Sequence, residues 1–285
     1  MTSSSAAISV RGLRKSYDGV EVVAGIDLEV ARGEIFTILG PNGAGKSTTV
    51  EILEGYRKAD SGELLVLGEN PARPASGERV WRNRIGIVLQ SASDAGDLTV
   101  AETVHHFARY YTKAKDPDHV IELVGLTEKS RAKVATLSGG QRRRLDVALG
   151  IIGSPEILFL DEPTTGFDPE ARRAFWELIR TLRDEGTTIL LTTHYLDEAQ
   201  ALADRVAVML KGRIIEIATP DLLGGRGDAL ARVSWSEGGA TQHSESANPT
   251  AFVTQLSTRL GGEIPDLTVT RPSLEDIYLR MIGEA

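Results

Sequence analysis

The sequence predicts an α/β fold in which a parallel β-sheet is covered by helices. Short apolar runs alternate along the chain with segments of helical period, which is typical of such a fold. The runs are continuously apolar or β-branched rather than alternately polar, as expected for strands that are buried on both faces. The predicted core strands are residues 35–39, 85–89, 157–160, 188–192 and 206–210.

Elements outside these runs complete the expected core. Residues 8–10 and 26–30 have strand character and are predicted to form an antiparallel β edge. One helix is expected to begin after the N-cap residue Asp168, because Pro169 then occupies the first helical position. Its apolar residues recur at helical spacing, and it should end before Gly186.

The segment from about residue 91 to residue 155 differs from the rest, because it has little strand character. Helical spacing predicts helices over residues 100–111, 117–124 and 141–152. We therefore expect a helical subdomain that is inserted between two strands of the core.

The segment Gly-Gly-Arg-Gly at residues 224–227 predicts a flexible link near the C-terminus. We expect a first domain over residues 1–224 and an accessory domain over residues 225–285. The accessory domain is predicted to be a small α+β unit. Its expected elements are a strand over 229–236, a polar stretch, a helix over 252–260, a short strand near 267–269 and a last helix opened by a capping box of Ser273 and Asp276.

Composition excludes several classes of protein. Hydrophobic residues are 41% of the 285 residues, which is enough for a packed core, and charged residues are 25%, which is ordinary for a globular protein. The net charge of −8 argues against a nucleic-acid partner. The absence of cysteine excludes disulfides, thiol catalysis and cysteine-ligated metals. No apolar run reaches the ~18 residues of a membrane span, and residues 1–10 do not resemble a signal peptide, so we expect a cytosolic product.

The segment 40–47, Gly-Pro-Asn-Gly-Ala-Gly-Lys-Ser, matches the phosphate-binding loop G-x-x-x-x-G-K-[ST]. It follows a predicted strand and opens a helix, so its backbone N–H groups and the helix N-terminus can surround phosphates. Lys46 is expected to reach the β- and γ-phosphates, and Ser47 to hold Mg²⁺. The nucleotide-binding residues predicted here are Asn42, Gly43, Gly45, Lys46, Ser47 and Thr48.

Two acids, Asp161 and Glu162, end the apolar strand at residues 157–160. Asp161 suits the coordination of Mg²⁺, and Glu162 suits a general base that polarises the attacking water. Taken alone, the two acids could equally mark the end of a strand and its turn. The phosphate loop favours the catalytic interpretation.

Leu-Ser-Gly-Gly-Gln at residues 137–141 resembles the signature motif of ATP-binding cassette (ABC) ATPases. Together with the phosphate loop and the acidic strand, this resemblance covers residues 8–223 and implies a P-loop NTPase core of the RecA-like kind. It implies that the signature binds nucleotide through Ser138, Gly139, Gly140 and Gln141. A helix that begins at Ser-Gly-Gly can also stabilise an anion by itself. Phe167 stands where the family more often has Leu.

The resemblance also implies roles for four single residues. They are Tyr17, stacked on adenine; Gln90, a Mg²⁺ sensor coupled to a membrane partner; Asp168, a dimer contact; and His194, a catalytic residue at the γ-phosphate. Each has a structural alternative: Tyr17 could be a turn aromatic, Asp168 is also an N-cap, and Gln90 and His194 could be ordinary polar residues at strand ends.

The C-terminal residues 272–279 are similar to the tail of the drug- and antibiotic-resistance exporter subfamily. This resemblance implies an ATPase that uses ATP and Mg²⁺, pairs with a second cassette in a homodimer, and powers a separate transmembrane permease subunit from the inner face of the cell membrane. The implied substrate is a drug, an antibiotic or a lipid-like compound. A soluble ABC-type ATPase without transport and a non-hydrolysing regulatory module are the alternatives; Glu162 and His194 argue against the second.

Overall fold

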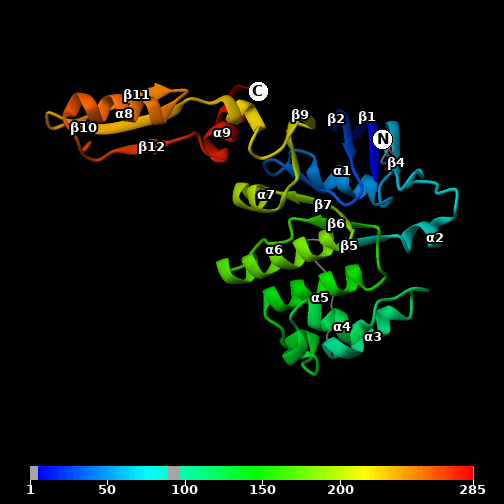
Figure 1. The fold of residues 1–285 in the computed structure, drawn as a ribbon. Helices are drawn as coiled ribbons and strands as arrows, with labels where there is room; N and C mark the ends of the chain where they lie inside the picture. Colours follow the sequence, from blue (N-terminus) through cyan, green and yellow to red (C-terminus); the bar gives the residue numbers. More distant parts are fainter. Residues whose placement is uncertain (1–5, 89–96, 285) are drawn as a thin grey trace, which may run out of the picture. The chain divides into compact units, whose positions relative to one another are not determined.

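The computed structural model describes residues 6–88 and 97–284. It divides into two compact units, residues 1–217 and residues 218–285, which are described separately (Figure 1). The first unit contains the elements that carry the nucleotide motifs. Among the described residues, no helix is long and apolar enough to cross a membrane.

The first unit is built on a six-stranded sheet with the order β5-β6-β7-β3-β8-β9. The pairs β5–β6, β6–β7, β7–β3 and β3–β8 are parallel, which confirms the predicted parallel sheet. Its strands are β3 (Ile35–Leu39), β5 (Ile85–Val88), β6 (Ile157–Asp161), β7 (Thr188–Thr193), β8 (Arg205–Leu210) and β9 (Arg213–Ala218). The predicted fifth residue of β5, Leu89, lies outside the described residues.

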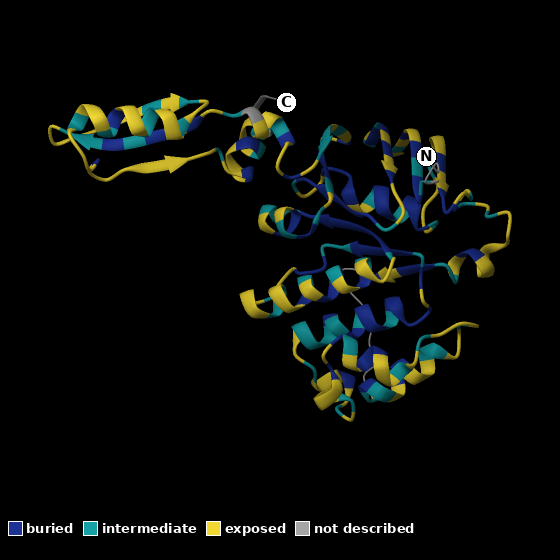
Figure 2. Ribbon diagram, viewed as in Figure 1, coloured by how far each residue is buried: buried dark blue, intermediate teal, exposed yellow. Residues whose placement is uncertain are grey.

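Alternate residues of β6 point into two hydrophobic cores, one on each face of the sheet. Ile157 and Phe159 belong to one core, and Leu158 and Leu160 belong to the other. All four residues are fully buried, and Figure 2 shows the inner strands of the sheet mostly in the dark blue of buried residues. The sheet is therefore covered on both sides, which explains why its central strands are continuous runs of mostly apolar or β-branched residues.

The predicted antiparallel edge forms a separate three-stranded sheet with the order β2-β1-β4. Its strands β1 (Ile8–Tyr17) and β2 (Val20–Val30) are antiparallel and much longer than predicted. The third strand, β4 (Ser61–Val66), was not predicted. Only Leu64 and Val66 of β4 are buried, so the strand has no continuous apolar run.

The helical segment lies between β5 and β6 in the chain, as predicted, although the bounds of its helices differ from the predicted ranges. Helix α3 (Val100–Ala108) ends three positions before the predicted end at Tyr111. Helices α4 (Pro117–Leu123) and α5 (Gly139–Ile151) follow, with short 3₁₀ turns η1 (Thr127–Lys129) and η2 (Val134–Thr136) between them. The remaining helices of the unit are α1 (Lys46–Leu53), α2 (Glu78–Arg82), α6 (Pro169–Asp184) and α7 (Leu196–Leu202).

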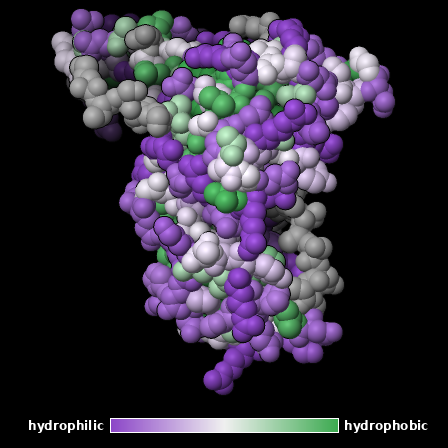
Figure 3. Space-filling view, turned by 90° about the vertical axis from the view of Figure 1, so that its right-hand side faces the viewer, coloured by the Kyte–Doolittle hydropathy of each residue, from purple (hydrophilic) through white to green (hydrophobic). Residues whose placement is uncertain are grey.

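The one side of the molecule that Figure 3 displays is mostly hydrophilic, with hydrophobic side chains gathered in its upper part.

The second unit contains a three-stranded antiparallel sheet with the order β11-β10-β12. Its elements are the 3₁₀ segment η3 (Leu223–Asp228), β10 (Ala231–Glu237), β11 (Ala240–Ser246), α8 (Pro249–Leu260), β12 (Thr268–Thr270) and α9 (Leu274–Glu284). Strand β11 lies in the stretch predicted only as polar, and it was missed because most of its side chains are exposed.

The segment 224–227, which was predicted to be a flexible link, lies within η3. Gly224 and Gly225 have φ of 58° and 72°, which glycine adopts without strain. At Gly224 a Cβ would lie 2.2 Å from Ile277 of α9, so the missing side chain allows close packing within the unit.

Candidate nucleotide-binding site

The phosphate loop connects β3 to α1, as the motif predicts. Gly43 and Gly45 have φ of 80° and 102°, a region that other residues rarely adopt. At Gly45 a Cβ would also lie 2.5 Å from the carbonyl oxygen of Val22 on β2. The loop can therefore take this course only with glycine at these positions.

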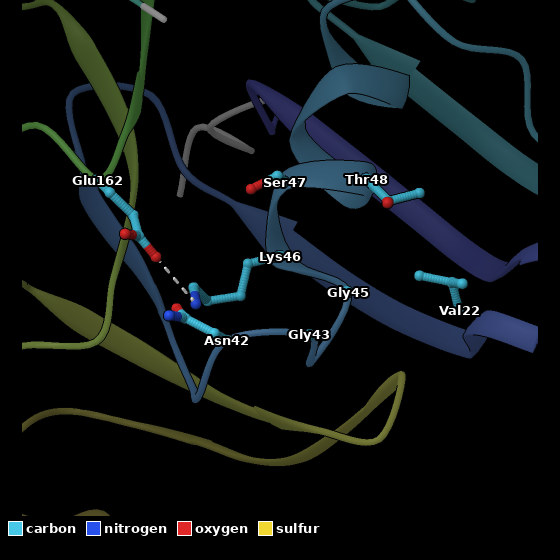
Figure 4. Close-up of a pocket in the computed structure, with 8 residues that line it drawn as sticks. All are labelled: Val22, Asn42, Gly43, Gly45, Lys46, Ser47, Thr48 and Glu162. Atoms are coloured by element: carbon cyan, nitrogen blue, oxygen red, sulfur yellow. Dashed lines mark ion pairs between the residues drawn. The ribbon is translucent and has the colours of Figure 1, made fainter. Parts of the chain in front are cut away.

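A cavity of about 330 Å³ lies over this loop (Figure 4). Seven of its lining residues were predicted from the sequence: Asn42, Gly43, Gly45, Lys46, Ser47, Thr48 and Glu162. The eighth, Val22, belongs to no motif, and its place in the cavity follows from the position of β2. Sequence reasoning had no signal for it.

Lys46 is buried and its amine is held at three oxygens. Nζ donates to the carbonyl oxygens of Gly40 at 2.9 Å and Pro41 at 3.2 Å. It also forms an ion pair with Glu162, with 3.2 Å between Nζ and Oε1 (Figure 4). The amine is thus fixed beside the backbone of the loop, where it can bind a phosphate.

Asp161 lies at the end of β6, beside the start of α1. Its Oδ1 accepts hydrogen bonds from the hydroxyl of Ser47 at 3.2 Å and from the hydroxyl of Thr192 on β7. Carboxylate and hydroxyl oxygens are ligands that Mg²⁺ accepts in phosphate sites, where it keeps water and substrate ligands as well. The pair of Asp161 and Ser47 therefore fits a magnesium ion.

Glu162 has a φ of 45°, which is uncommon for a residue other than glycine. Its backbone N–H donates to the carbonyl oxygen of Thr192 at 3.2 Å and to the hydroxyl of the same residue at 3.1 Å. Oε2 of Glu162 lies 3.2 Å from Nδ1 of His194, although the two are not aligned as a hydrogen bond. The structure thus brings together Lys46, Glu162 and His194.

Arg143 of α5 supports the acidic strand from the helical segment, and sequence reasoning missed it. Its guanidinium donates to the carbonyl oxygens of Pro163 and Asp161, each at 3.0 Å. Burial lowers the pKa of Arg143, an effect that Asp146, Asp161 and Glu198 oppose. The three consecutive arginines after Gln141 gave no indication of which one faces the site.

The signature residues form the N-terminus of α5. They line a second pocket, which is separate from the phosphate-loop cavity. Ser138 is the N-cap of this helix: its hydroxyl accepts from the N–H of Gln141, and the Gln141 side chain accepts from the N–H of Ser138. Gly139 and Gly140 line the same pocket, together with Asp168, whose carboxylate caps α6. None of the residues that line this pocket lines the phosphate-loop cavity.

Among the described residues predicted for the site, Tyr17, Asp161 and His194 line neither pocket, although Asp161 and His194 contact residues that do. Tyr17 ends β1, and its ring centroid lies 5.3 Å from Nζ of Lys15 and 5.5 Å from the guanidinium of Arg57. It is absent from the residues that line the cavity. Gln90 lies outside the described residues. Their roles at adenine and at Mg²⁺ stay predictions.

Comparison with known proteins decides the family. The family model described as ABC transporter matches residues 23–165. The daunorubicin resistance ATP-binding protein DrrA3 of Streptomyces coeruleorubidus is 37% identical over 98% of this chain and 96% of its own length. The chain belongs to the ABC transporter family.

Further relatives agree with this assignment. The Nod factor export ATP-binding protein I of Rhizobium sp. (strain N33) is 38% identical to this ABC protein over 98% of both chains. The solved structure of cbiO1 from Clostridium perfringens, part of the ABC transporter complex cbiONQ, is 31% identical with a TM-score of 0.69, over 76% of this chain and 89% of that one. An ATP-binding subunit of an ABC transporter with a TM-score of 0.71 covers 97% of this chain and 99% of its own, and at 21% identity it shares the fold.

The family assignment confirms the predicted ATPase activity and the P-loop NTPase fold. This ABC protein binds ATP and hydrolyses it in support of transport. The phosphate-loop cavity is the candidate site for this activity.

Proposed function

We propose that this ABC ATPase powers the export of an amphiphilic small molecule through a separate permease subunit. The observation that carries the proposal is the similarity along nearly the whole chain to relatives named for daunorubicin resistance and for Nod factor export. The similarity includes the second unit, so the accessory domain is shared as well. A drug, an antibiotic or a lipid-like compound is the proposed substrate, and the inner face of the membrane is the proposed location.

Hydrolysis is proposed to use the residues that meet at the cavity. Lys46 and the N–H groups of the loop bind the β- and γ-phosphates. Glu162 takes up the proton of the attacking water and orients that water toward the γ-phosphate, while His194 contacts the γ-phosphate. Ser47 and Asp161 are the residues that would hold Mg²⁺, which neutralises phosphate charge when it is bound.

A homodimer is proposed as the active unit, with two cassettes arranged head to tail. The support is geometric: in one chain the signature residues around Ser138 line a pocket that shares no residue with the phosphate-loop cavity. A helix N-terminus such as that of α5 favours an anion. A second chain could bring its own signature helix to the exposed side of the bound nucleotide, with Asp168 at the contact.

Transport into inside-out vesicles tests the proposal. The chain is co-produced with a candidate permease, and ATP-driven uptake of daunorubicin is measured by fluorescence. We expect uptake that requires ATP and is abolished by Glu162→Gln. The outcome that would contradict the proposal is ATP hydrolysis without uptake of daunorubicin or of a lipid-like probe, whichever candidate permease is used. It would favour an ATPase that is not coupled to this class of substrate.

A further inference from the structure

A buried glutamate on α7 follows His194 by four residues and belongs to none of the motifs. This residue, Glu198, is fully buried, with none of its surface exposed. It lines neither the phosphate-loop cavity nor the signature pocket. Because glutamate is almost never fully buried unless its carboxyl group has partners, the contacts of Glu198 indicate what it does.

Glu198 does not have the role that is usual for a glutamate at its place in a helix. Tyr195 is the N-cap of α7, so Glu198 occupies the third helical position, where a glutamate often accepts from the N–H of the N-cap residue. That N–H donates instead to the hydroxyl of Thr193, at 3.0 Å. The side chain of Glu198 is therefore available for contacts in the interior.

Three side chains from separate parts of the first unit interact with the carboxyl group of Glu198. The indole Nε1 of Trp176 on α6 donates to Oε1 at 3.4 Å. The hydroxyls of Thr193, at the end of β7, and of Thr164, in the turn after Glu162, also interact with the carboxyl group. Oε2 and the Thr164 hydroxyl are both buried, and neither is aligned in a hydrogen bond with a described residue.

Thr193 connects the turn that carries His194 to the phosphate loop. Its hydroxyl accepts from the N–H of Tyr195, so this bond spans His194 from the residue before it to the residue after it. Its carbonyl oxygen accepts from the N–H of Gly40, the first residue of the loop, at 3.3 Å. A shift of Thr193 would therefore move His194 relative to the bound phosphates.

Thr164 has a comparable place in the turn that carries Glu162. Its carbonyl oxygen accepts from the N–H of Phe167 at 3.1 Å, which closes this turn before α6 begins. Because Glu198 interacts with both Thr164 and Thr193, it joins the turn after β6 to the turn after β7.

Burial raises the pKa of Glu198, an effect that the two hydroxyls, the indole and the charge of Arg172 oppose. The guanidinium of Arg172 pairs with Asp197 at 3.2 Å and lies 4.7 Å from the ring centroid of Tyr195. The raised pKa favours the protonated acid, which can donate to one hydroxyl and accept from another group. A neutral carboxyl group is thus suited to connect the neutral partners around it.

We propose that Glu198 is a positioning residue for ATP hydrolysis, which fixes the turn of His194 against the turn of Glu162 so that both side chains face the γ-phosphate together. The inference rests on the proposed roles of His194 and Glu162. The alternative is that Glu198 only supports packing, in which case its loss would change stability and leave the chemical step intact.

Steady-state ATP hydrolysis by the full chain tests the proposal. Glu198→Leu removes the carboxyl group and should lower kcat by about 10–100-fold, the usual cost of losing a residue that orients a catalytic group. KM for ATP should change little, because the phosphate loop and Lys46 remain. Glu198→Gln should recover most of the lost turnover, because its amide can donate and accept at the same positions. An unchanged kcat in Glu198→Leu, or no recovery in Glu198→Gln, would overturn the proposal.

Trp176→Phe tests the same carboxyl group without removing it, and it decides the matter if Glu198→Leu does not fold. The loss of one hydrogen bond to Oε1 should lower kcat roughly 5-fold. Trp81→Phe is the matched control, because Nε1 of this buried tryptophan on α2 also donates one hydrogen bond, to the carbonyl oxygen of Val66 at 3.2 Å. It should keep the kcat of the wild type. An equal loss of kcat in the two variants would assign the effect to packing and overturn the proposal.

His194→Ala separates this inference from the proposed function. If Glu198 acts through His194, then Glu198→Leu should cost less turnover in the His194→Ala background than in the wild type, because residues that act as a unit give non-additive losses. Losses that multiply in full would show that the two residues act independently and would overturn the inference alone. An unchanged kcat in His194→Ala would refute the proposed role of His194, and the inference with it.

Discussion

Lys46 and Glu162 form an ion pair inside the nucleotide cavity, with 3.2 Å between Nζ and Oε1. Both side chains are mostly buried there, with 4% and 11% exposed. The lysine that should bind the γ-phosphate is therefore engaged with the carboxylate that should activate water. We expect nucleotide binding to exchange this pair for contacts between Lys46 and phosphate, which would release Glu162 for the water.

Glu162→Gln should separate binding from hydrolysis. The variant loses the competing ion pair, so its affinity for ATP should equal or exceed that of the wild type. Turnover should fall by about 10²–10⁴-fold, the usual contribution of a general base. Equilibrium titration with ATP and a phosphate-release assay measure the two quantities.

The same variant should accumulate as an ATP-bound dimer, because it binds nucleotide and does not consume it. Light scattering in excess ATP measures its mass. A variant that remains monomeric would argue against the head-to-tail dimer, and an equal loss of binding and turnover would mean that Glu162 is mainly structural.

Lys46→Ala should weaken ATP binding, because it removes a charged donor from the phosphates. Loss of such a contact is worth about 1.5–3 kcal/mol, or roughly 10–150-fold in affinity. Titration with a fluorescent ATP analogue measures the change. Lys129→Ala, at an exposed position in η1, is the control and should bind as the wild type does. An unchanged affinity in Lys46→Ala would place the phosphates elsewhere.

Thr192→Val should lower turnover with a small effect on nucleotide affinity. The hydroxyl of Thr192 donates to Asp161 and accepts from the N–H of Glu162, so it positions both acids. We expect roughly a 10-fold loss of turnover, consistent with a supporting hydrogen bond beside a metal site. The concentration of Mg²⁺ needed for half-maximal activity should rise as well.

Thr37→Val is the matched control for this change. Thr37 lies on β3, next to β7, and is equally buried, but its hydroxyl has no hydrogen-bond partner among the described residues. The substitution should leave turnover and Mg²⁺ dependence unchanged and should not destabilise the fold. Equal effects of the two substitutions would show that Thr192 acts through packing alone.

Glu54→Gln should change how stability depends on pH. Burial and the nearby Asp161 and Glu51 raise the pKa of Glu54 from 4.5 to about 8, so the folded state favours the protonated acid. The stability associated with this proton is complete below the unfolded pKa and is lost as the pH rises through about 8. The wild type should therefore lose stability from pH 5 to pH 8 relative to Glu54→Gln, by at most about 1.4 kcal/mol per pH unit.

Urea unfolding at several pH values between 5 and 9 measures this difference. Glu63→Gln, on the exposed part of β4, is the control and should follow the wild type at every pH. Parallel stability curves for the wild type and Glu54→Gln would mean that Glu54 has an ordinary pKa in the folded chain.

The sequence by itself predicted those parts whose structure depends on neighbouring residues. The phosphate loop needs glycine at Gly43 and Gly45 because of their backbone conformation, and the helix after Asp168 begins where its N-cap and Pro169 require. The core strands were found because burial on both faces demands an apolar residue at each position. Strands β4, β9 and β11 were missed because at most two residues of each are buried, so they lack that pattern.

Only the tertiary structure decided which distant residues meet at the site. Parallel strands end at one edge of the sheet, so β6 and β7 bring Asp161 and Thr192 together beside the phosphate loop. Val22 and Arg143 reach the same region from another sheet and from the helical segment, with no motif to announce them. The burial of Glu54 is likewise a tertiary property, because a glutamate at the end of a helix is ordinary in the sequence. Its burial follows from the elements that are packed around it.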